Sequence, residues 1–531
     1  PIKSSAASDV YKRQVRNLVE FIFREGDIDN RSSRAMSADA MMEGTRIHRK
    51  IQGSMGKEYQ AEVPLSLVVE GDLYELTVEG RADGIFTEDG KCFVDEIKGM
   101  YRKVELFEKP VFVHRAQAMC YAYIFALQNN METIGIQMTY CNLETEQTKY
   151  FREEFSFEEI KKWFDDLMEE YGKWATFQCE MKNQRQASIK ELDFPYEYRP
   201  GQKKLVSDVY RTIMRQKLLF MQAPTGVGKT ISTIFPAVKA VGEELADRIF
   251  YLTAKTITAT VAKETFALLE KNGYRAKTIQ ITAKEKLCPC DEMECNPVTC
   301  PYAKGHFDRV NDAVFDLLHR CEMIERDDIL SQADRYTVCP FELCLDTASW
   351  CDNIICDYNY VFDPNVYLKR FFQEGIKGDY IFLIDEAHNM VERSRQMYSA
   401  QIYKEDFLTV KRIMKEHSHS IEKALEKCNK ILLGMKRECE NYTVYDTFGN
   451  MVFSFMRLMT LLDEFLQKAN EFPGKKDVMD FYFELRNFLN IYDLVDEHYV
   501  MYSELEADGR FMLKLFCVDP SLNIQKRLDK G

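Results

Sequence analysis

One short stretch limits the fold of this chain more than any other feature. Residues 223–230 read Ala-Pro-Thr-Gly-Val-Gly-Lys-Thr and follow a short apolar segment, 218–222. Glycines such as Gly226 and Gly228 let backbone N–H groups approach a phosphate, and the N-terminus of a following helix adds a favourable dipole. We therefore predict a strand, then a phosphate-binding loop with alanine in place of its first glycine, then a helix.

A second stretch complements the first. Residues 381–384 are apolar and precede Asp385 and Glu386. We expect Lys229 to contact the β- and γ-phosphates of ATP, and Thr230 and Asp385 to hold Mg²⁺, while Glu386 orients or deprotonates the attacking water. Taken alone, each stretch is also compatible with a glycine-rich turn or a helix-capping acidic pair. Together, each at the end of a strand, they predict an ATP site.

The sequence around these stretches predicts an α/β fold. Apolar segments at 218–222, 249–253, 353–357 and 380–385 alternate with helical patterns, which indicates a parallel sheet with crossover helices over 194–531. Residues 15–178 predict a separate mixed α/β domain. Its strands lie near 73–86 and 91–99 and are joined by a hairpin turn at Glu88-Asp89-Gly90.

Length and charge exclude several classes of protein. A chain of 531 residues is too long for one core, so at least two domains are expected. The net charge of -14 excludes a uniformly basic DNA-coating protein, but not a motor that grips one strand in a local groove. No apolar run is long enough to span a membrane and no secretory signal is present, so we expect a cytoplasmic location.

The two nucleotide stretches resemble those of superfamily 2 helicases of the DEAH type. Tyr198-Arg199-Pro200-Gly201-Gln202 is similar to the adenine-reading motif of that family, which implies that Gln202 contacts the base. Residues 251–256 are similar to a motif that grips a DNA strand. On physical grounds alone, that segment is a strand end with a Thr/Lys cap.

Cysteines cluster between the two nucleotide stretches. Cys288, Cys290, Cys295 and Cys300 fall close together, and Cys339 follows. Stable disulfides are rare in the cytoplasm, so a metal is the better explanation, either zinc or an iron–sulfur cluster. Zinc sites usually show paired Cys-x2-Cys knuckles, which are absent here.

The position of this insert, 283–350, resembles the XPD/DinG-type helicases. The resemblance implies a [4Fe-4S] cluster on Cys288, Cys295, Cys300 and Cys339. Cys290 departs from the family pattern and either replaces Cys288 or is a spare thiol. The resemblance also implies 5′-to-3′ movement along DNA and makes residues 393–505 a helical, Arch-like insert that encloses the strand.

The domain at 15–178 carries scattered polar residues with a shared chemistry. Glu96 and Lys98 lie on the same face of one predicted strand, and Asp83 lies on its hairpin partner. Two carboxylates with an imidazole, His48, can hold Mg²⁺ or Mn²⁺, and Lys98 can position water or stabilise charge on a phosphate. Any one of these residues alone is more simply a surface charge or an ordinary core residue.

The full set resembles the RecB-like branch of the PD-(D/E)XK nucleases. In that family Gly-x3-His, Asp, Glu-x-Lys and Gln-x3-Tyr recur in order. The matching residues in this chain are Gly44 and His48, Asp83, Glu96 and Lys98, and Gln117 and Tyr121. The resemblance implies that Asp83, Glu96 and Lys98 are catalytic.

Three expectations concern the ends and joints of the chain. Residues 1–14 do not join the helical pattern that follows, so we expect a non-native leader. Residues 179–193 are polar without periodicity, which predicts a linker. No motif of a second RecA-like lobe follows, so we expect a C-terminally truncated motor that binds ATP weakly and does not unwind DNA.

These observations combine into one hypothesis with two rivals. We expect a helicase fused to a nuclease for DNA repair or processing, acting on single-stranded or junction DNA, with ATP, Mg²⁺ or Mn²⁺ and a [4Fe-4S] cluster as cofactors. One rival keeps the helicase but makes the front domain a DNA clamp that does not cut. The other is a redox-sensing DNA-binding protein in which ATP is only a conformational ligand.

Overall fold

The computed structural model describes residues 9–30, 38–56, 58–100, 104–143, 145–224, 226–254, 256–291, 293–373, 376, 378–469 and 471–530. The chain divides into two compact units. Unit 1 comprises 1–187, 294–319 and 331–339, and unit 2 comprises 188–293, 320–330 and 340–531.

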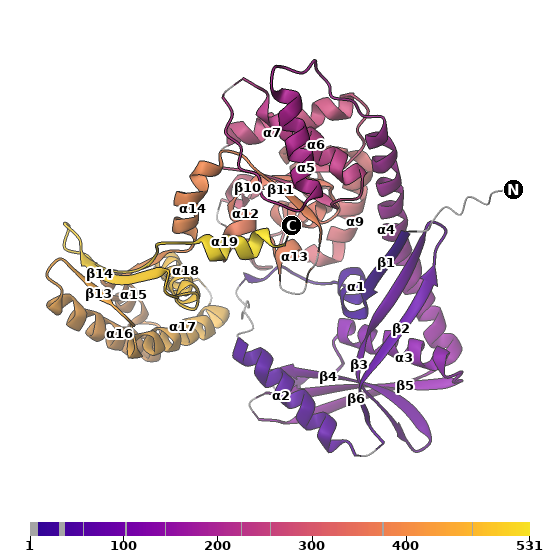
Figure 1. The fold of residues 1–531 in the computed structure, drawn as a ribbon. Helices are drawn as coiled ribbons and strands as arrows, with labels where there is room; N and C mark the ends of the chain where they lie inside the picture. The colour runs from indigo at the N-terminus through magenta and orange to yellow at the C-terminus, as the bar shows by residue number, and fades with distance from the viewer. Residues whose placement is uncertain are drawn as a thin grey trace. The chain divides into compact units, whose positions relative to one another are not determined.

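The front domain of unit 1 is a mixed sheet packed against helices (Figure 1). Its described strands run in the order β1-β3-β4-β5-β6, with β2 on the other edge of β3. The elements are β1 Asp9–Gln14, α1 Val15–Ile22, α2 Ala38–Ser54, β2 Gln60–Glu70, β3 Tyr74–Glu88, β4 Lys91–Met100, η2 Val104–Leu106, α3 Phe112–Gln128, β5 Thr133–Asn142, β6 Thr148–Ser156 and α4 Phe157–Lys190.

The predicted hairpin of this domain is confirmed. Strands β3 and β4 pair antiparallel from Gly84↔Asp95 to Glu88↔Lys91. Asp89 and Gly90 form the turn with φ of 50° and 77°. A two-residue turn with positive φ at both positions matches the twist of the strands it joins. Helix α3 covers one face of the sheet, where its buried side chains join one core with α1, α4 and the strands.

The partners of β3 leave a gap along one of its edges. On one side, strand β2 pairs with β3 from Gln60↔Ile85 to Glu70↔Glu75. On the other side, β1 pairs with Tyr74–Glu79 and β4 with Gly84–Glu88. Among the described strands, none pairs along this second edge between Gly80 and Asp83. Strands β3 and β4 therefore form a fork that opens at Asp83.

Two expectations about the joints were wrong. Residues 9–14, set aside as part of a leader, form strand β1, and Arg13 Nε donates to the hydroxyl of Tyr171 at 2.7 Å. The rest of that leader, 1–8, lies outside the described residues. Most of the predicted linker, 179–190, continues helix α4. It contains no glycine or proline, and its buried Cys179, Arg185 and Ile189 supply a packed face.

Part of the cysteine-bearing insert belongs to unit 1. It contributes most of α9 (His306–Arg320) and α10 (Arg326–Tyr336). Residues 24–30 of the front domain run along it. The amides of Ile28 and Asn30 donate to the carbonyls of Ala303 and Cys295, each at 2.9 Å. We call residues 24–30 the strap.

Unit 2 is built on a parallel sheet in the order β11-β7-β10-β8-β9, with crossover helices between strands. Strands β7 and β10 are buried on both faces, as is usual for parallel sheets. The elements are α5 Gln202–Met214, α6 Lys229–Gly242, β7 Arg248–Thr253, α7 Thr256–Lys271, β8 Thr278–Gln280, α8 Lys284–Leu287, β9 Met323–Ile324, α11 Pro340–Ala348, β10 Asn353–Asp357, α12 Asn359–Phe362, α13 Lys369–Phe372, β11 Tyr380–Ile384, η3 Ala387–Asn389 and α14 Met390–Met397.

The predicted strand at 218–222 is wrong. These residues have no regular structure, and Leu218 and Phe220 are 61% and 88% exposed. A strand needs a hydrogen-bonded neighbour, and within the described residues none pairs with this segment. Strand β11, which directly precedes Asp385 and Glu386, forms an edge of the sheet, and its side chains are mostly half-exposed.

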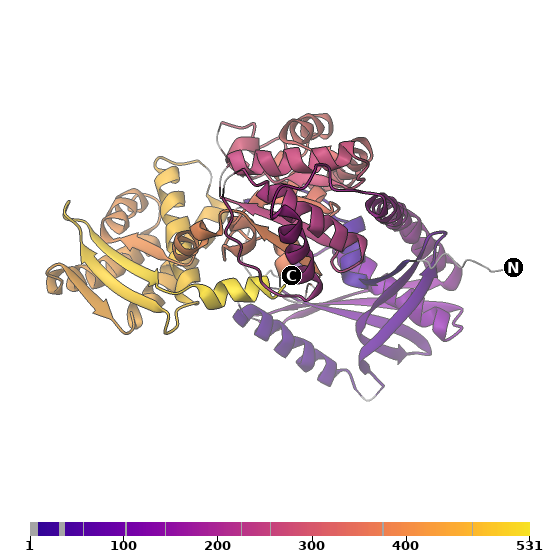
Figure 2. The same ribbon diagram turned by 45° about the horizontal axis from the view of Figure 1, so that its top comes forward.

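The segment predicted to be a helical insert, 393–505, also contains strands. Its helices share one core with an antiparallel sheet of order β12-β15-β14-β13, seen in yellow and orange in Figure 2. Short strands with few alternating residues are hidden among long helical patterns, which explains the error. The elements are β12 Ala400–Tyr403, α15 Lys404–Met414, α16 His419–Glu438, β13 Tyr442–Tyr445, α17 Asn450–Lys468, α18 Lys475–Tyr492, β14 Tyr499–Leu505, β15 Phe511–Cys517 and α19 Ser521–Leu528.

No helix in the described part of the chain combines the length and the apolar composition needed to cross a bilayer.

Candidate functional site

The phosphate-binding loop lies at the start of α6. Gly226 and Gly228 have φ of 84° and 75°, a region open to glycine at little cost. Gly228 is the N-cap of α6, so the helix N-terminus faces the loop. Lys229 is its first residue, and its Nζ lies 3.9 Å from Glu386 Oε1. Thr225 of this loop lies outside the described residues.

The acidic pair meets this loop from the end of β11. The Asp385 amide donates to the carbonyl of Leu252 at 2.9 Å, which fixes its position beyond the sheet. Tyr251 lies near Thr230 and Asp385, and burial, together with the charge of Asp385, raises the pKa of its hydroxyl. Burial, together with Glu386, raises the pKa of Asp385. The structure thus brings together the residues expected to hold Mg²⁺ and phosphate, with Tyr251 as a member that sequence reasoning missed.

Gln202 has a different neighbourhood from the one expected. Its side chain is 5% exposed. Its Oε1 accepts from the amide of Arg199 at 3.0 Å, and its Nε2 donates to the carbonyl of Val227 at 3.1 Å. Arg199 in turn donates to the carbonyl of Gly226. In this structure Gln202 therefore supports the phosphate loop, and its contact with a base stays a prediction.

The carboxylates of the front domain converge at the fork between β3 and β4. Asp83 Oδ2 accepts from the amide of Ile97 at 2.7 Å. That amide lies just beyond the last pair of the β3–β4 ladder. Glu96 is 1% exposed, and its Oε1 lies 2.7 Å from Lys98 Nζ. The expected same-face arrangement of Glu96 and Lys98 is therefore present.

Helix α3 adds Gln117 and Tyr121 to this cluster. Gln117 Oε1 accepts from Lys98 Nζ at 3.4 Å, and Tyr121 lies near Gln117 on the same helix. Tyr121 reaches across to β3 because residue 80 is glycine. A Cβ at Gly80 would lie 2.6 Å from the Tyr121 hydroxyl.

Helix α2 adds His48. Its Nδ1 lies 3.7 Å from Asp83 Oδ1, beyond hydrogen-bonding distance. One turn further along, Gln52 Nε2 donates to the carbonyl of Asp83 at 2.9 Å. Ile47 and Ile51 of the same helix pack with Ile97 in a small core, which holds α2 against β4. The structure therefore places all six expected side chains around one fork.

The electrostatics of the fork favour a cation. Burial and the neighbouring Asp83 raise the pKa of Glu96 to about 8, although Lys98 opposes the shift. Burial also raises the pKa of Asp83. Glu96 Oε2 is buried and has no hydrogen-bond partner. A divalent cation would satisfy this oxygen, and Mg²⁺ is commonly held by only one or two carboxylates and several waters. A divalent cation at the fork stays a prediction, because the described residues contain no group of three or more His, Cys, Asp or Glu side chains that could hold a metal ion.

Sequence reasoning missed Asp95, the residue before Glu96. Its side chain is fully buried. Asp95 Oδ2 accepts from the hydroxyl of Tyr59 at 2.9 Å, and Oδ1 from that of Thr139 at 2.6 Å. An acidic pair Asp-Glu inside an apolar strand was the available signal, because a buried carboxylate needs donors.

The cysteines expected to hold a cluster are divided between the units. Cys295, Cys300 and Cys339 belong to unit 1, whereas Cys288 belongs to unit 2. The amide of Cys339 donates to His306 Nδ1 at 3.1 Å. Over the described residues, no three or more His, Cys, Asp or Glu side chains are grouped so as to hold a metal ion. The cluster therefore stays a prediction from the sequence. Cys344, Cys351 and Cys356 are buried core residues.

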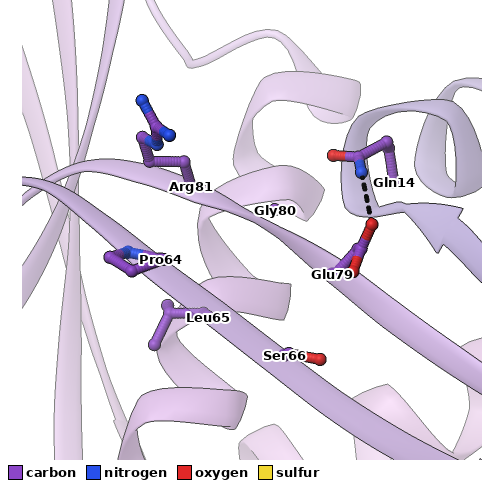
Figure 3. Close-up of a pocket in the computed structure, with 7 residues that line it drawn as sticks. All are labelled: Gln14, Pro64, Leu65, Ser66, Glu79, Gly80 and Arg81. Atoms are coloured by element: carbon purple, nitrogen blue, oxygen red, sulfur yellow. Dashed lines mark hydrogen bonds between the residues drawn. The ribbon is translucent and has the colours of Figure 1, made fainter.

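A shallow hollow of about 550 Å³ lies over the ends of β1 and the middle of β2 and β3 (Figure 3). Gln14 Nε2 donates to Glu79 Oε1 across it at 3.0 Å. Gly80 and Arg81 line it, but the six fork residues do not.

Comparison with known proteins points to one group of helicases. Residues 268–407, which include the cysteine cluster and Asp385-Glu386, match the DEAD_2 family model. The Regulator of telomere elongation helicase 1 of Rattus norvegicus is 20% identical over 248 residues, 38% of this chain and 19% of that protein. The General transcription and DNA repair factor IIH helicase subunit XPD/RAD3 of Saccharomyces cerevisiae is 24% identical over 232 residues, 37% of this chain and 29% of that protein.

Two solved structures are also matched. One titled XPD_Helicase is 17% identical, has a TM-score of 0.38 and covers 60% of this chain and 54% of that one. One titled Truncated XPD is 16% identical, has a TM-score of 0.39 and covers 61% of this chain and 90% of that one. The chain spans less than a third of the length of the rat and yeast relatives. The family model and these two relatives support a likeness to XPD-type superfamily 2 helicases.

Proposed function

We propose that this chain carries the ATP-binding lobe of an ATP-dependent DNA helicase that works in DNA repair. One observation carries the proposal. Lys229 Nζ, at the start of α6, lies 3.9 Å from Glu386 Oε1, just after β11, and the neighbouring Thr230 and Asp385 both lie near Tyr251. A phosphate-binding lysine, a magnesium-binding hydroxyl and carboxylate, and a water-orienting glutamate are the groups that nucleotide hydrolysis needs.

The front domain is a metal-dependent DNA nuclease in this proposal. Asp83 and Glu96 hold Mg²⁺ or Mn²⁺, which supplies a Lewis acid and lowers the pKa of a bound water. Lys98, fixed by Glu96 and Gln117, lies where it can stabilise charge on the scissile phosphate. His48 and Tyr121 border the same fork.

The remaining parts of the proposal rest on the sequence resemblance. Single-stranded or junction DNA moves 5′ to 3′ along the motor and is cut by the front domain. Cys288, Cys295, Cys300 and Cys339 hold a [4Fe-4S] cluster, and the protein acts in the cytoplasm.

Equilibrium binding of a fluorescent ATP analogue with Mg²⁺ tests the nucleotide site. We expect Lys229→Ala to weaken binding by about tenfold or more, since a charge-assisted phosphate contact contributes about 1.5–3 kcal/mol. Glu386→Gln keeps binding, because its predicted role begins after binding. Lys271→Ala, at the exposed end of α7, is the control. Equal binding by wild type and Lys229→Ala would refute the proposed site.

A further inference from the structure

A second pocket of the front domain lies over strands β3, β5 and β6. It has a volume of about 480 Å³, within the usual range for small-molecule sites. Its lining comes from the C-terminal end of α2, the following loop, and strands β3, β5 and β6. Its lining includes Tyr59, Phe86, Glu88, Gln137, Tyr150 and Arg152.

One hydrogen bond connects the pocket to strand β4 of the fork. Tyr59 donates its hydroxyl proton to Asp95, which precedes Glu96 in β4. The ring of Tyr59 lies against Gly84, the residue after Asp83, so closely that a Cβ there would come within 1.9 Å of the ring. Tyr59 therefore contacts Gly84 and Asp95, which are the sequence neighbours of Asp83 and Glu96.

Three aromatic residues line the pocket, Tyr59, Phe86 and Tyr150. The rings of Tyr59 and Phe86 are stacked with centroids 6.0 Å apart. The Arg152 guanidinium lies 5.6 Å from the centroid of the Phe86 ring. Tyr150 is 48% exposed at the pocket, so its ring offers an open face. Aromatic faces beside an arginine plane are the surfaces on which unpaired nucleic-acid bases stack.

Charge indicates which part of a nucleotide fits. The lining contains one arginine and two glutamates, Glu58 and Glu88. Arg152 is paired with Glu88, and its Nε donates to Gln137 Oε1 at 2.7 Å. The lining therefore repels a phosphate and accepts a neutral aromatic ring. By contrast, the hollow of Figure 3 has no aromatic residue.

The buried polar groups of the pocket already have partners. Gln137 Nε2 donates to Thr139 Oγ1 at 3.1 Å, and Tyr59 donates to Asp95. A base edge would find few groups to read it, so stacking here is independent of base identity.

We propose that this pocket holds one unstacked base of a single DNA strand, next to the phosphate at the fork, by stacking on Tyr150 against the Tyr59–Phe86 wall. The inference rests on the proposed nuclease function for its ligand. It adds to that function a base-binding subsite that positions single-stranded substrate.

The test measures fluorescence anisotropy of a short labelled oligothymidine with the full chain in EDTA, where no divalent cation permits cleavage. We expect Tyr150→Ala to bind about fivefold or more weakly, from the usual contribution of one base–aromatic stack. Tyr150→Phe, which keeps the ring, should bind like the wild type. Tyr442→Ala removes a tyrosine that is 71% exposed on β13 and is the matched control.

A second probe separates base from backbone. With a base-free oligodeoxyribose phosphate, the difference between wild type and Tyr150→Ala should vanish. The proposal would be overturned if wild type and Tyr150→Ala still differed with the base-free probe. It would also be overturned if both proteins bound oligothymidine equally, and the pocket would then be assigned to binding a protein side chain. Because no cleavage is measured, an inactive nuclease fork leaves this result unaffected, and the two failures can be told apart.

Discussion

The hydroxyl of Tyr121 reaches β3 only because residue 80 has no side chain. Tyr121 is 3% exposed, and a Cβ at Gly80 would lie 2.6 Å from its hydroxyl. A single glycine therefore makes room for one of the fork residues. Gly80 lies three residues before Asp83, but nothing in the sequence indicated which helix would use the space.

Substitution of this glycine tests the packing. Gly80→Ala should cost about 1–3 kcal/mol of unfolding free energy, because its Cβ would lie 2.6 Å from the Tyr121 hydroxyl. Urea unfolding of the two proteins measures the difference. Gly53→Ala in helix α2 meets nothing within 4 Å and should be neutral or stabilising by up to about 1 kcal/mol. Equal stability of Gly80→Ala and wild type would contradict the packing.

His114 makes the front domain sensitive to acid. Burial, with the charges of Lys98 and Arg16, lowers the pKa of His114 to about 4. The unfolded chain binds this proton near its ordinary pKa of about 6.5, so stability is lost as the pH falls from about 6.5 to about 4.

We expect His114→Gln to lose less stability than wild type between about pH 7 and pH 5, by about 2 kcal/mol. Urea unfolding at both pH values measures this difference. The same change at the exposed His419 of unit 2 should have no such effect. Parallel pH profiles for wild type and His114→Gln would show that the histidine is not shielded.

At the scale of elements, regular patterns were predictable and exposed or short segments were not. The β3–β4 hairpin follows from alternation and the Asp89-Gly90 turn. Strands β12 and β13 are only four residues long, too short for a periodic signal among helices. The segment 218–222 has the composition of a strand, but pairing depends on a neighbour that local sequence does not reveal.

The strap shows a contact between distant segments that no local pattern encodes. Asn311 in α9 anchors it, since Arg24 Nε donates to Asn311 Oδ1 at 2.8 Å and Asn311 Nδ2 donates to the carbonyl of Phe21 at 2.8 Å. Further along the strap, the Gly305 amide donates to Asp27 at 2.6 Å. The front domain and this part of the cysteine-bearing insert therefore share one hydrogen-bonded surface.

Removal of the anchor should loosen the strap. Asn311→Ala deletes three hydrogen bonds, each contributing about 0.5–1.5 kcal/mol, so the amides of Ile28 and Asn30 should exchange about tenfold faster or more. Hydrogen–deuterium exchange reports on these amides. Asn365→Ala removes an exposed pair with Asn487 in unit 2 and should leave them unchanged. Unchanged exchange in Asn311→Ala would show that the strap does not depend on this anchor.

At the scale of the whole molecule, two separate sets of chemical groups lie in two units. The nucleotide residues lie in unit 2 and the fork residues in unit 1. Both sets could be selected from the sequence because each follows a spaced motif. The supporting roles of Tyr251 and Tyr59 could not, because they depend on contacts between segments that are distant in sequence.

We propose that the fork of the front domain cuts DNA and that the same chain carries an ATP-binding motor lobe. Cleavage of end-labelled single-stranded DNA with Mg²⁺ or Mn²⁺ tests it, with wild type compared with Lys98→Ala and with Lys91→Ala as an exposed control on the same strand. We predict cleavage by wild type and by Lys91→Ala, and a loss of about a hundredfold or more in Lys98→Ala, as for removal of one preorganised group that stabilises transition-state charge. No cleavage by any of the three proteins, with DNA binding intact, would contradict the claim and make the front domain a DNA clamp.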